Sequence, residues 1–168
     1  MTKWAGLEGT SIIAAEKEEK LLETLPRELV EVAKGFKEYL SVIPESKIAM
    51  EVGVSAMHDV TEGGVFGALW ELGEASGVGI TAHLDKIPIK QETIEVCEVF
   101  KINPYMLISS GSMMIGCEKG NLLVEKLEEA GINAAVIGRA TEGNDRIVVS
   151  RDETRYIGPA GSDELYKI

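Results

Sequence analysis

A short apolar run, a glycine turn, a helix and a second strand follow one another between residues 54 and 84, and this order constrains the fold most strongly. The segment is VSAMHDVTEGGVFGALWELGEASGVGITAHL. Apolar residues recur at helical spacing from Gly63 to Ser76, and Gly77 suits a helix C-terminus. The runs 54–60 and 78–84 have the character of strands. The sequence therefore predicts a helix that connects two strands.

The flanking sequence extends this pattern with further helices and strands. Further helices are predicted over residues 8–22, 26–40, 44–54, 91–100 and 120–131. Further strands are predicted over residues 112–118, 133–141 and 145–150. The late strands on either side of the turn 142–145 look hairpin-connected, whereas others are separated by helices. We therefore expect an α+β fold with a mixed sheet covered by helices.

Composition limits the classes of partner. At 168 residues with 45% hydrophobic residues, the chain is long enough for one domain with a real core. The net charge of -11 is spread along the chain, which indicates a solvated acidic surface and argues against nucleic acid as a partner. No apolar run reaches membrane-spanning length and no signal peptide opens the sequence, which argues against a membrane and favours the cytoplasm.

The cysteines and the first residues support two further expectations. Cys97 and Cys117 lie far apart without a CxxC motif, so we expect two buried, reduced thiols rather than a disulfide or a metal site. The first residues have the pattern of a strand end that leads into a glycine turn and a helix. We expect residues 1–168 to be the C-terminal domain of a longer protein. The alternative is a complete small protein with a short first strand.

The turn at residues 58–64 has the chemistry of an anion site. Asp59 and Thr61 are good helix N-caps, and Gly63 and Gly64 let backbone N–H groups approach a ligand. A helix N-terminus with free N–H donors favours an anion. The alternative is a capped turn whose glycines serve packing. His58 could contact a phosphate or pair with the neighbouring carboxylate.

A wider series of residues resembles a known family. The pattern Asp-x-Thr-x-Gly-Gly of the turn is followed by Ser-Gly-Val-Gly at 76–79, Ile-Pro at 87–88 and Ile-Gly at 137–138. From Thr2 to about Val149 the chain resembles the C-terminal domain of the AIR synthase-related superfamily, whose fold is an α/β sandwich with a mixed sheet. The likeness is greatest to the hydrogenase expression/formation branch.

This resemblance implies a function. Members are two-domain, dimeric, ATP-dependent enzymes in which the N-terminal domain supplies most nucleotide and Mg²⁺ ligands and the C-terminal domain closes over the site. The usual chemistry is attack of a small-molecule substrate on the γ-phosphate. On this basis Asp59 is the candidate catalytic residue, no metal ligand is expected in this chain, and its main partner is its own N-terminal domain. The candidate phosphate- or substrate-binding residues are His58, Thr61, Glu62, Gly63 and Gly64.

The sequence departs from that branch at two places. Its C-terminus, GPAGSDELYKI, lacks the terminal Cys that accepts a carbamoyl group in the carbamoyl-dehydrating relatives. Glu62 stands where those relatives usually carry a basic residue, and a carboxylate beside bound phosphates would repel them. The alternative function is therefore a non-catalytic module that binds a small anionic metabolite or a maturation partner.

Overall fold

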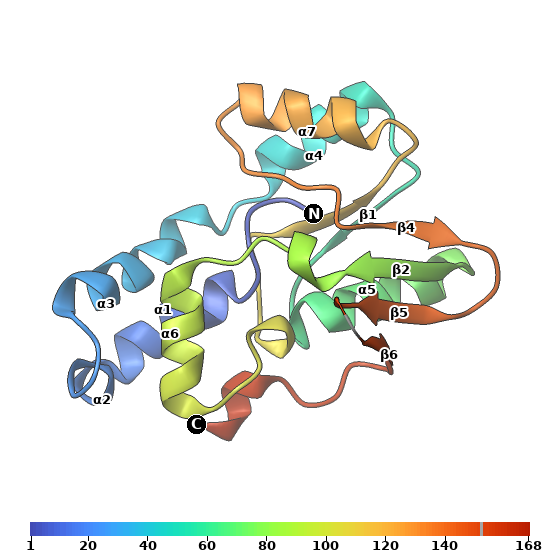
Figure 1. The fold of residues 1–168 in the computed structure, drawn as a ribbon. Helices are drawn as coiled ribbons and strands as arrows, with labels where there is room; N and C mark the ends of the chain where they lie inside the picture. Colours follow the sequence, from blue (N-terminus) through green and yellow to red (C-terminus); the bar gives the residue numbers. More distant parts are fainter. Residues whose placement is uncertain (152) are drawn as a thin grey trace.

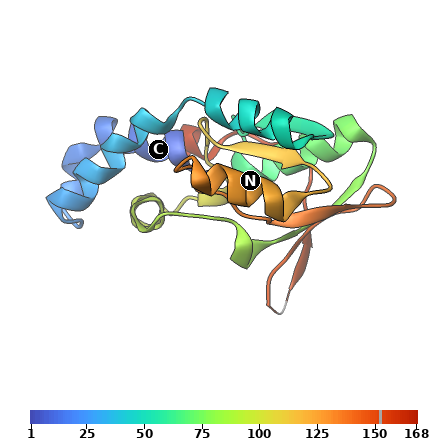
Figure 2. The same cartoon turned by 90° about the horizontal axis from the view of Figure 1, so that it is seen from above.

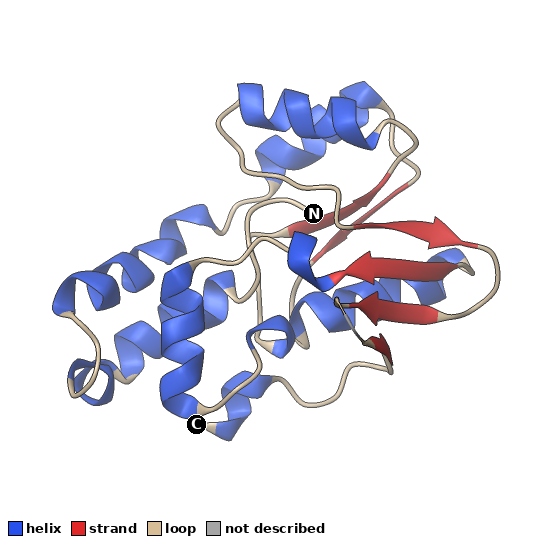
Figure 3. Ribbon diagram, in the orientation of Figure 1, coloured by secondary structure: helices blue, strands red, loops and turns tan. Residues whose placement is uncertain are grey.

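The computed structural model describes residues 1–151 and 153–168, which form helices packed on two small sheets (Figures 1 and 3). The α-helices are α1 (Leu7–Glu16), α2 (Glu18–Leu22), α3 (Arg27–Lys34), α4 (Ile43–Val52), α5 (Gly64–Ser76), α6 (Gln91–Phe100) and α7 (Gly120–Glu129). The strands are β1 (Ala56–Asp59), β2 (Gly79–His83), β3 (Met113–Gly116), β4 (Gly138–Thr141), β5 (Arg146–Val149) and β6 (Thr154–Tyr156). Short 3-10 helices cover Gly35–Tyr39, Leu84–Lys86, Pro104–Met106 and Glu164–Lys167.

The strands form a mixed arrangement, which confirms the α+β expectation. Strand β1 pairs with β3 in an antiparallel ladder, and the second sheet has the order β4-β2-β5-β6. Strand β2 is antiparallel to β4 and parallel to β5. The expected hairpin across residues 142–145 is wrong, because β4 and β5 lie on opposite sides of β2. The hairpin in this region joins β5 to β6 instead.

Helix α5 links the two sheets. It contacts strands of both, and its buried face, which includes Val65, Ala68 and Leu69, shares one core with Ile80 of β2 and Met114 of β3. Helices α4 and α7 pack together on another side of the β1–β3 pair (Figure 2). Helices α1, α3 and α6 form a separate group with its own core. In the part of the chain that the structure describes, no helix is both long and apolar enough to cross a bilayer.

A buried ion pair joins the start of the chain to this framework. Lys3 is buried and donates from Nζ to three backbone carbonyls, those of Tyr39, Ser41 and Gly111, at 2.7–2.9 Å. The carboxylate of Glu45 on α4 lies 2.6 Å from the same Nζ, and its side chain is 1% exposed. Because the carbonyls use all three ammonium donors, Glu45 acts as a counter-ion rather than as an aligned hydrogen-bond acceptor.

We expect Lys3→Met to lower the free energy of unfolding by roughly 3–5 kcal/mol, because it leaves the Glu45 carboxylate buried without its partner. The matched control is Lys126→Met, which breaks the exposed Lys126–Glu129 pair and is expected to change stability by less than about 1 kcal/mol. Urea unfolding followed by circular dichroism measures both. Equal effects of the two variants would show that the buried pair does not hold the fold together.

Candidate functional site

The turn between β1 and α5 is formed by two left-handed glycines. Gly63 has φ 78° and Gly64 has φ 60°, and α5 begins at Gly64 without a side-chain cap. The expectation that Asp59 or Thr61 caps this helix is therefore wrong. A Cβ on Gly64 would lie 2.6 Å from the carbonyl oxygen of Leu107 and 2.8 Å from that of Tyr105. Gly64 is thus required for close packing of the turn against the segment that contains the 3-10 helix Pro104–Met106.

The amide of Gly63 already binds a carboxylate of the same chain. Its N–H donates to Oδ2 of Asp163 at 2.7 Å. Oδ1 of Asp163 accepts from the N–H groups of Ile108 at 3.2 Å and Leu165 at 2.9 Å, and the residue is buried. The sequence analysis did not identify Asp163, because nothing in the spacing of the C-terminal residues relates them to the turn. The turn does accept an anion, and that anion is supplied from residues 158–168.

The C-terminal segment 158–168 covers one side of the turn. The hydroxyl of Tyr166 donates to Oε1 of Glu62 at 2.5 Å, and this hydrogen bond raises the pKa of Tyr166. The methyl group of Ala160 lies 2.9 Å from the position that a Cβ on Gly63 would take and 3.2 Å from that of a Cβ on Gly67. Glu62 therefore contacts the C-terminal segment.

Asp59 is an exposed acid of the turn, as is Glu62. The side chain of Asp59 is 63% exposed at the end of β1. Next to it, His58 is fixed by two oxygens: Nε2 lies 3.1 Å from the carboxylate of Glu71 on α5, and Nδ1 lies 2.5 Å from the backbone oxygen of Asp59. The imidazole is thus oriented by β1–α5 packing. Its carboxylate partner is Glu71 rather than the Asp59 side chain, which is 4.0 Å away.

A cavity of about 450 Å³ adjoins the turn. Gly63 and Gly67 form its floor with Phe66, whose ring stacks on that of Tyr105 at 5.5 Å between centroids. Partial burial raises the pKa of Tyr105, so its hydroxyl stays protonated and can donate. Residues 156–161 also line the cavity. The turn therefore lies beside a space that can hold a small molecule.

The remaining groups of chemical interest are the possible metal ligands and the thiols of the two cysteines. Among residues 1–151 and 153–168, no three His, Cys, Asp or Glu side chains gather in a group that could hold a metal ion. Cys97 and Cys117 are free thiols, as expected. Cys97 is buried, and desolvation raises its pKa to about 12, so it is unreactive at neutral pH. Cys117 is only partly buried, so the expectation of two buried thiols is wrong for this residue.

Comparison with known proteins gives the same family as the sequence motifs. Residues 2–150 match the family described as AIR synthase related protein, C-terminal domain. The turn, the helix that follows it and strands β1 to β5 all lie inside that match. The chain therefore belongs to the AIR synthase related family through its C-terminal domain.

Individual relatives include hydrogenase maturation proteins and PurL subunits of phosphoribosylformylglycinamidine synthase. A Methanocaldococcus jannaschii protein named for hydrogenase expression/formation is 33% identical over 102 residues, which cover 58% of this chain and 30% of the relative. The crystal structure of E. coli HypE aligns with a TM-score of 0.78 at 23% identity, covering 98% of this chain and 50% of that one. A structure of the hydrogenase maturation protein HypE in complex with ATP aligns with a TM-score of 0.61 at 17% identity, covering 71% and 40%. This chain spans half or less of each of these proteins.

We expect Gly64→Ala to destabilise the protein more than Gly77→Ala. Both positions have a left-handed φ, of 60° and 63°, so both variants carry the same backbone strain of about 1–2 kcal/mol. Only Gly64 faces backbone atoms closer than 3.0 Å, whereas a Cβ on Gly77 meets nothing within 4 Å. Thermal unfolding of the two variants measures the difference. Equal midpoints would mean that Gly64 is free to serve a ligand instead of packing.

We expect Asp163→Ala to lower the free energy of unfolding by roughly 2–3 kcal/mol, because three N–H groups lose a charged acceptor. Hydrogen exchange at the Gly63 and Ile108 amides should accelerate as well. Asp85→Ala, at an exposed position in the short 3-10 helix Leu84–Lys86, is the control. Exchange at Gly63 that stays at the wild-type rate would contradict the role assigned to Asp163.

Proposed function

We propose that this chain is the C-terminal domain of an ATP-dependent enzyme of the AIR synthase type. In this proposal it closes over a nucleotide or phosphate site whose remaining groups belong to a separate N-terminal portion. The reaction is phosphoryl transfer that activates an oxygen of a small substrate. The observation that supports this most is the anion-accepting turn beside a cavity, in a fold shared with a protein whose structure holds ATP.

The donors at the turn fit phosphate oxygens. The amides of Gly63 and Ile108 already hold the two oxygens of one carboxylate, at 2.7 and 3.2 Å. A phosphate would bind the same donors once the Asp163 segment moves aside, and the first-turn amides of α5 would add the positive end of the helix dipole. Thr61, which is partly exposed beside Gly63, can add a hydroxyl donor.

The described residues of this chain do not form a complete Mg²⁺ site by themselves. Mg²⁺ requires near-octahedral oxygen ligation, and the exposed carboxylates that the turn offers are those of Asp59 and Glu62. We therefore assign most Mg²⁺ ligands to the N-terminal portion. ATP would supply the transferred phosphoryl group, and Asp59 would orient a metal-bound water or a basic partner at that site. His58 would position β1 through its contact with Glu71.

The C-terminal segment 158–168 presents the carboxylate of Asp163 to the turn. The substrate class that we propose is a small molecule whose amide or carboxyl oxygen is phosphorylated.

The test joins this chain to the N-terminal portion of the Methanocaldococcus jannaschii relative and measures phosphate release from ATP. We expect turnover by the joined protein, none by the 168-residue chain alone, and a loss of at least about tenfold in Asp59→Asn. Asp85→Asn is the matched control. Steady phosphate release by the chain alone would overturn the proposed division of the site. ATP binding without turnover would favour the binding module.

A further inference from the structure

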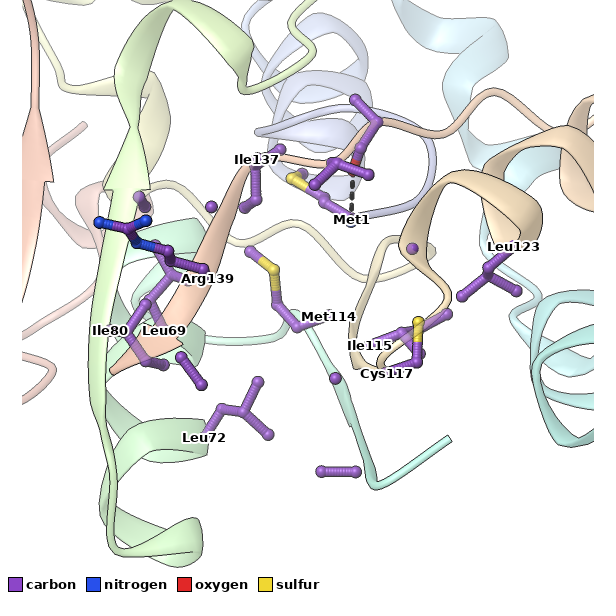
Figure 4. Close-up of a pocket in the computed structure, with 18 of the residues that line it drawn as sticks. Met1, Leu69, Leu72, Ile80, Met114, Ile115, Cys117, Leu123, Ile137 and Arg139 are labelled. Carbon is purple, nitrogen blue, oxygen red and sulfur yellow. Dashed lines mark hydrogen bonds between the residues drawn. The ribbon is translucent and has the colours of Figure 1, made fainter. Parts of the chain in front are cut away.

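The cavities in the described residues differ in the polar groups that they offer a ligand. The walls of a cavity of about 300 Å³ come from α5, through Leu69 and Leu72, and from α7, through Leu123 (Figure 4). These walls are mainly apolar, so few groups there could orient a ligand. The cavity of about 450 Å³ beside the turn, which we call the turn cavity, combines apolar walls with polar side chains.

The charged side chains of the turn cavity neutralise each other. Among its described lining residues, the charged ones are Glu153 and Arg155. The guanidinium group of Arg155 donates to Oε2 of Glu153 from Nε at 2.9 Å and from Nη2 at 2.5 Å, and both side chains are exposed. In the part of the chain that the structure describes, the turn cavity therefore offers no unpaired cation to a negatively charged ligand.

Three uncharged side chains of the turn cavity have hydrogen-bonding groups to spare. Oδ1 of Asn103 accepts from the backbone N–H of Tyr105 at 3.0 Å, which leaves the NH₂ group of Asn103 as a donor. For this NH₂ group and for the hydroxyls of Tyr105 and Ser150, the described residues supply no hydrogen-bond partner, yet none of the three is enclosed in the protein. They therefore remain available to a ligand or to water.

The remaining walls of the turn cavity are firm and apolar. Phe66, Leu84, Val148 and Ile157 line it and belong to, or pack against, the core that α5 shares with both sheets. Small-molecule sites have volumes of roughly 300–1,000 Å³ and are mostly apolar, with a few polar groups that fix the orientation of the ligand. The turn cavity therefore fits a ligand with an apolar body.

The unpartnered groups select the chemistry of this ligand. A carboxylate or phosphate would lose its hydration without gaining a counter-ion, and a hydrocarbon would leave the donors of Asn103, Tyr105 and Ser150 without partners. A carboxamide carries a carbonyl oxygen that accepts from these donors and an N–H that donates to a hydroxyl oxygen. It satisfies both kinds of group without a charge.

We propose that the turn cavity binds an uncharged carboxamide with an apolar body, held by the side chains of Asn103, Tyr105 and Ser150. The identification of this carboxamide as the substrate rests on the proposed function, in which an amide or carboxyl oxygen is phosphorylated, and it narrows that choice to the amide. Gly63 belongs both to the turn cavity and to the turn, so the bound carboxamide lies beside the donors that we assign to the phosphate.

The test compares benzamide with benzoate, which has the same ring but carries a carboxylate. NMR spectra of the ¹⁵N-labelled 168-residue chain follow the backbone amides while either ligand is added. We expect benzamide to shift the amides of Gly67 and Tyr105 with a Kd of about 1–10 mM, which is usual for so small a ligand. Benzoate should bind at least about fivefold more weakly, because its charge is desolvated without a partner.

Two variants test the hydrogen bonds. Tyr105→Phe keeps the ring that stacks on Phe66 and removes the hydroxyl, and Ser150→Ala removes the other hydroxyl. We expect each variant to raise the Kd for benzamide about threefold or more, which corresponds to the loss of one hydrogen bond. The control is Tyr39→Phe, at an exposed residue outside the turn cavity, which should leave the Kd unchanged.

Three outcomes would each overturn the proposal: benzoate that binds as tightly as benzamide, a Kd for benzamide that is unchanged in both variants, or no benzamide binding at about 50 mM. No nucleotide is present in these titrations. Failure of ATP turnover by the joined protein would therefore count against the proposed function alone, and failure of benzamide binding against this inference alone.

Discussion

The arrangement of the layers depends on the interactions that the Lys3 ammonium group makes. Its three hydrogen bonds join the end of the 3-10 helix Gly35–Tyr39, the residue Ser41 ahead of α4, and the loop at Gly111 that leads into β3. Glu45 neutralises the charge from α4. Since Lys3 directly follows the segment that bonds to both sheets, one side chain fixes the helical group relative to the strands. A buried charge is tolerated here because every donor it carries is used.

The parts of the fold that the sequence predicted are those with local periodicity. Helix α6 was predicted and found over residues 91–100, because its apolar positions repeat at helical spacing and face the core of α1 and α3. Long-range pairing was not predictable. The expected strand 133–141 is regular only from Gly138, because residues 133–135 bond to residues 1–3 rather than to β2. Strand β6 is exposed along its length, so no alternation marks it.

In the candidate site, too, the local features were predictable from the sequence and the long-range contacts were not. The sequence identified the turn, since its glycines and acids are adjacent, and the structure gives those glycines the left-handed φ that the pattern requires. The sequence did not identify the residues that contact the turn. Asp163 lies 100 residues from Gly63 in the sequence, and Leu107 contacts the turn only where it packs against Gly64. Whether a glycine serves a ligand or a neighbouring backbone depends on atoms that are distant in sequence. Here the atoms facing Gly64 are backbone.

The three acids near the turn have different partners. The C-terminal segment supplies Asp163, which accepts from backbone amides, and Tyr166, whose hydroxyl donates to Glu62. Asp59 stays exposed. If a phosphate replaced Asp163, as proposed, the same movement would release Glu62, whose charge would then oppose the new anion unless a cation accompanied it. A metal-bound nucleotide would meet that condition, and a free phosphate would not.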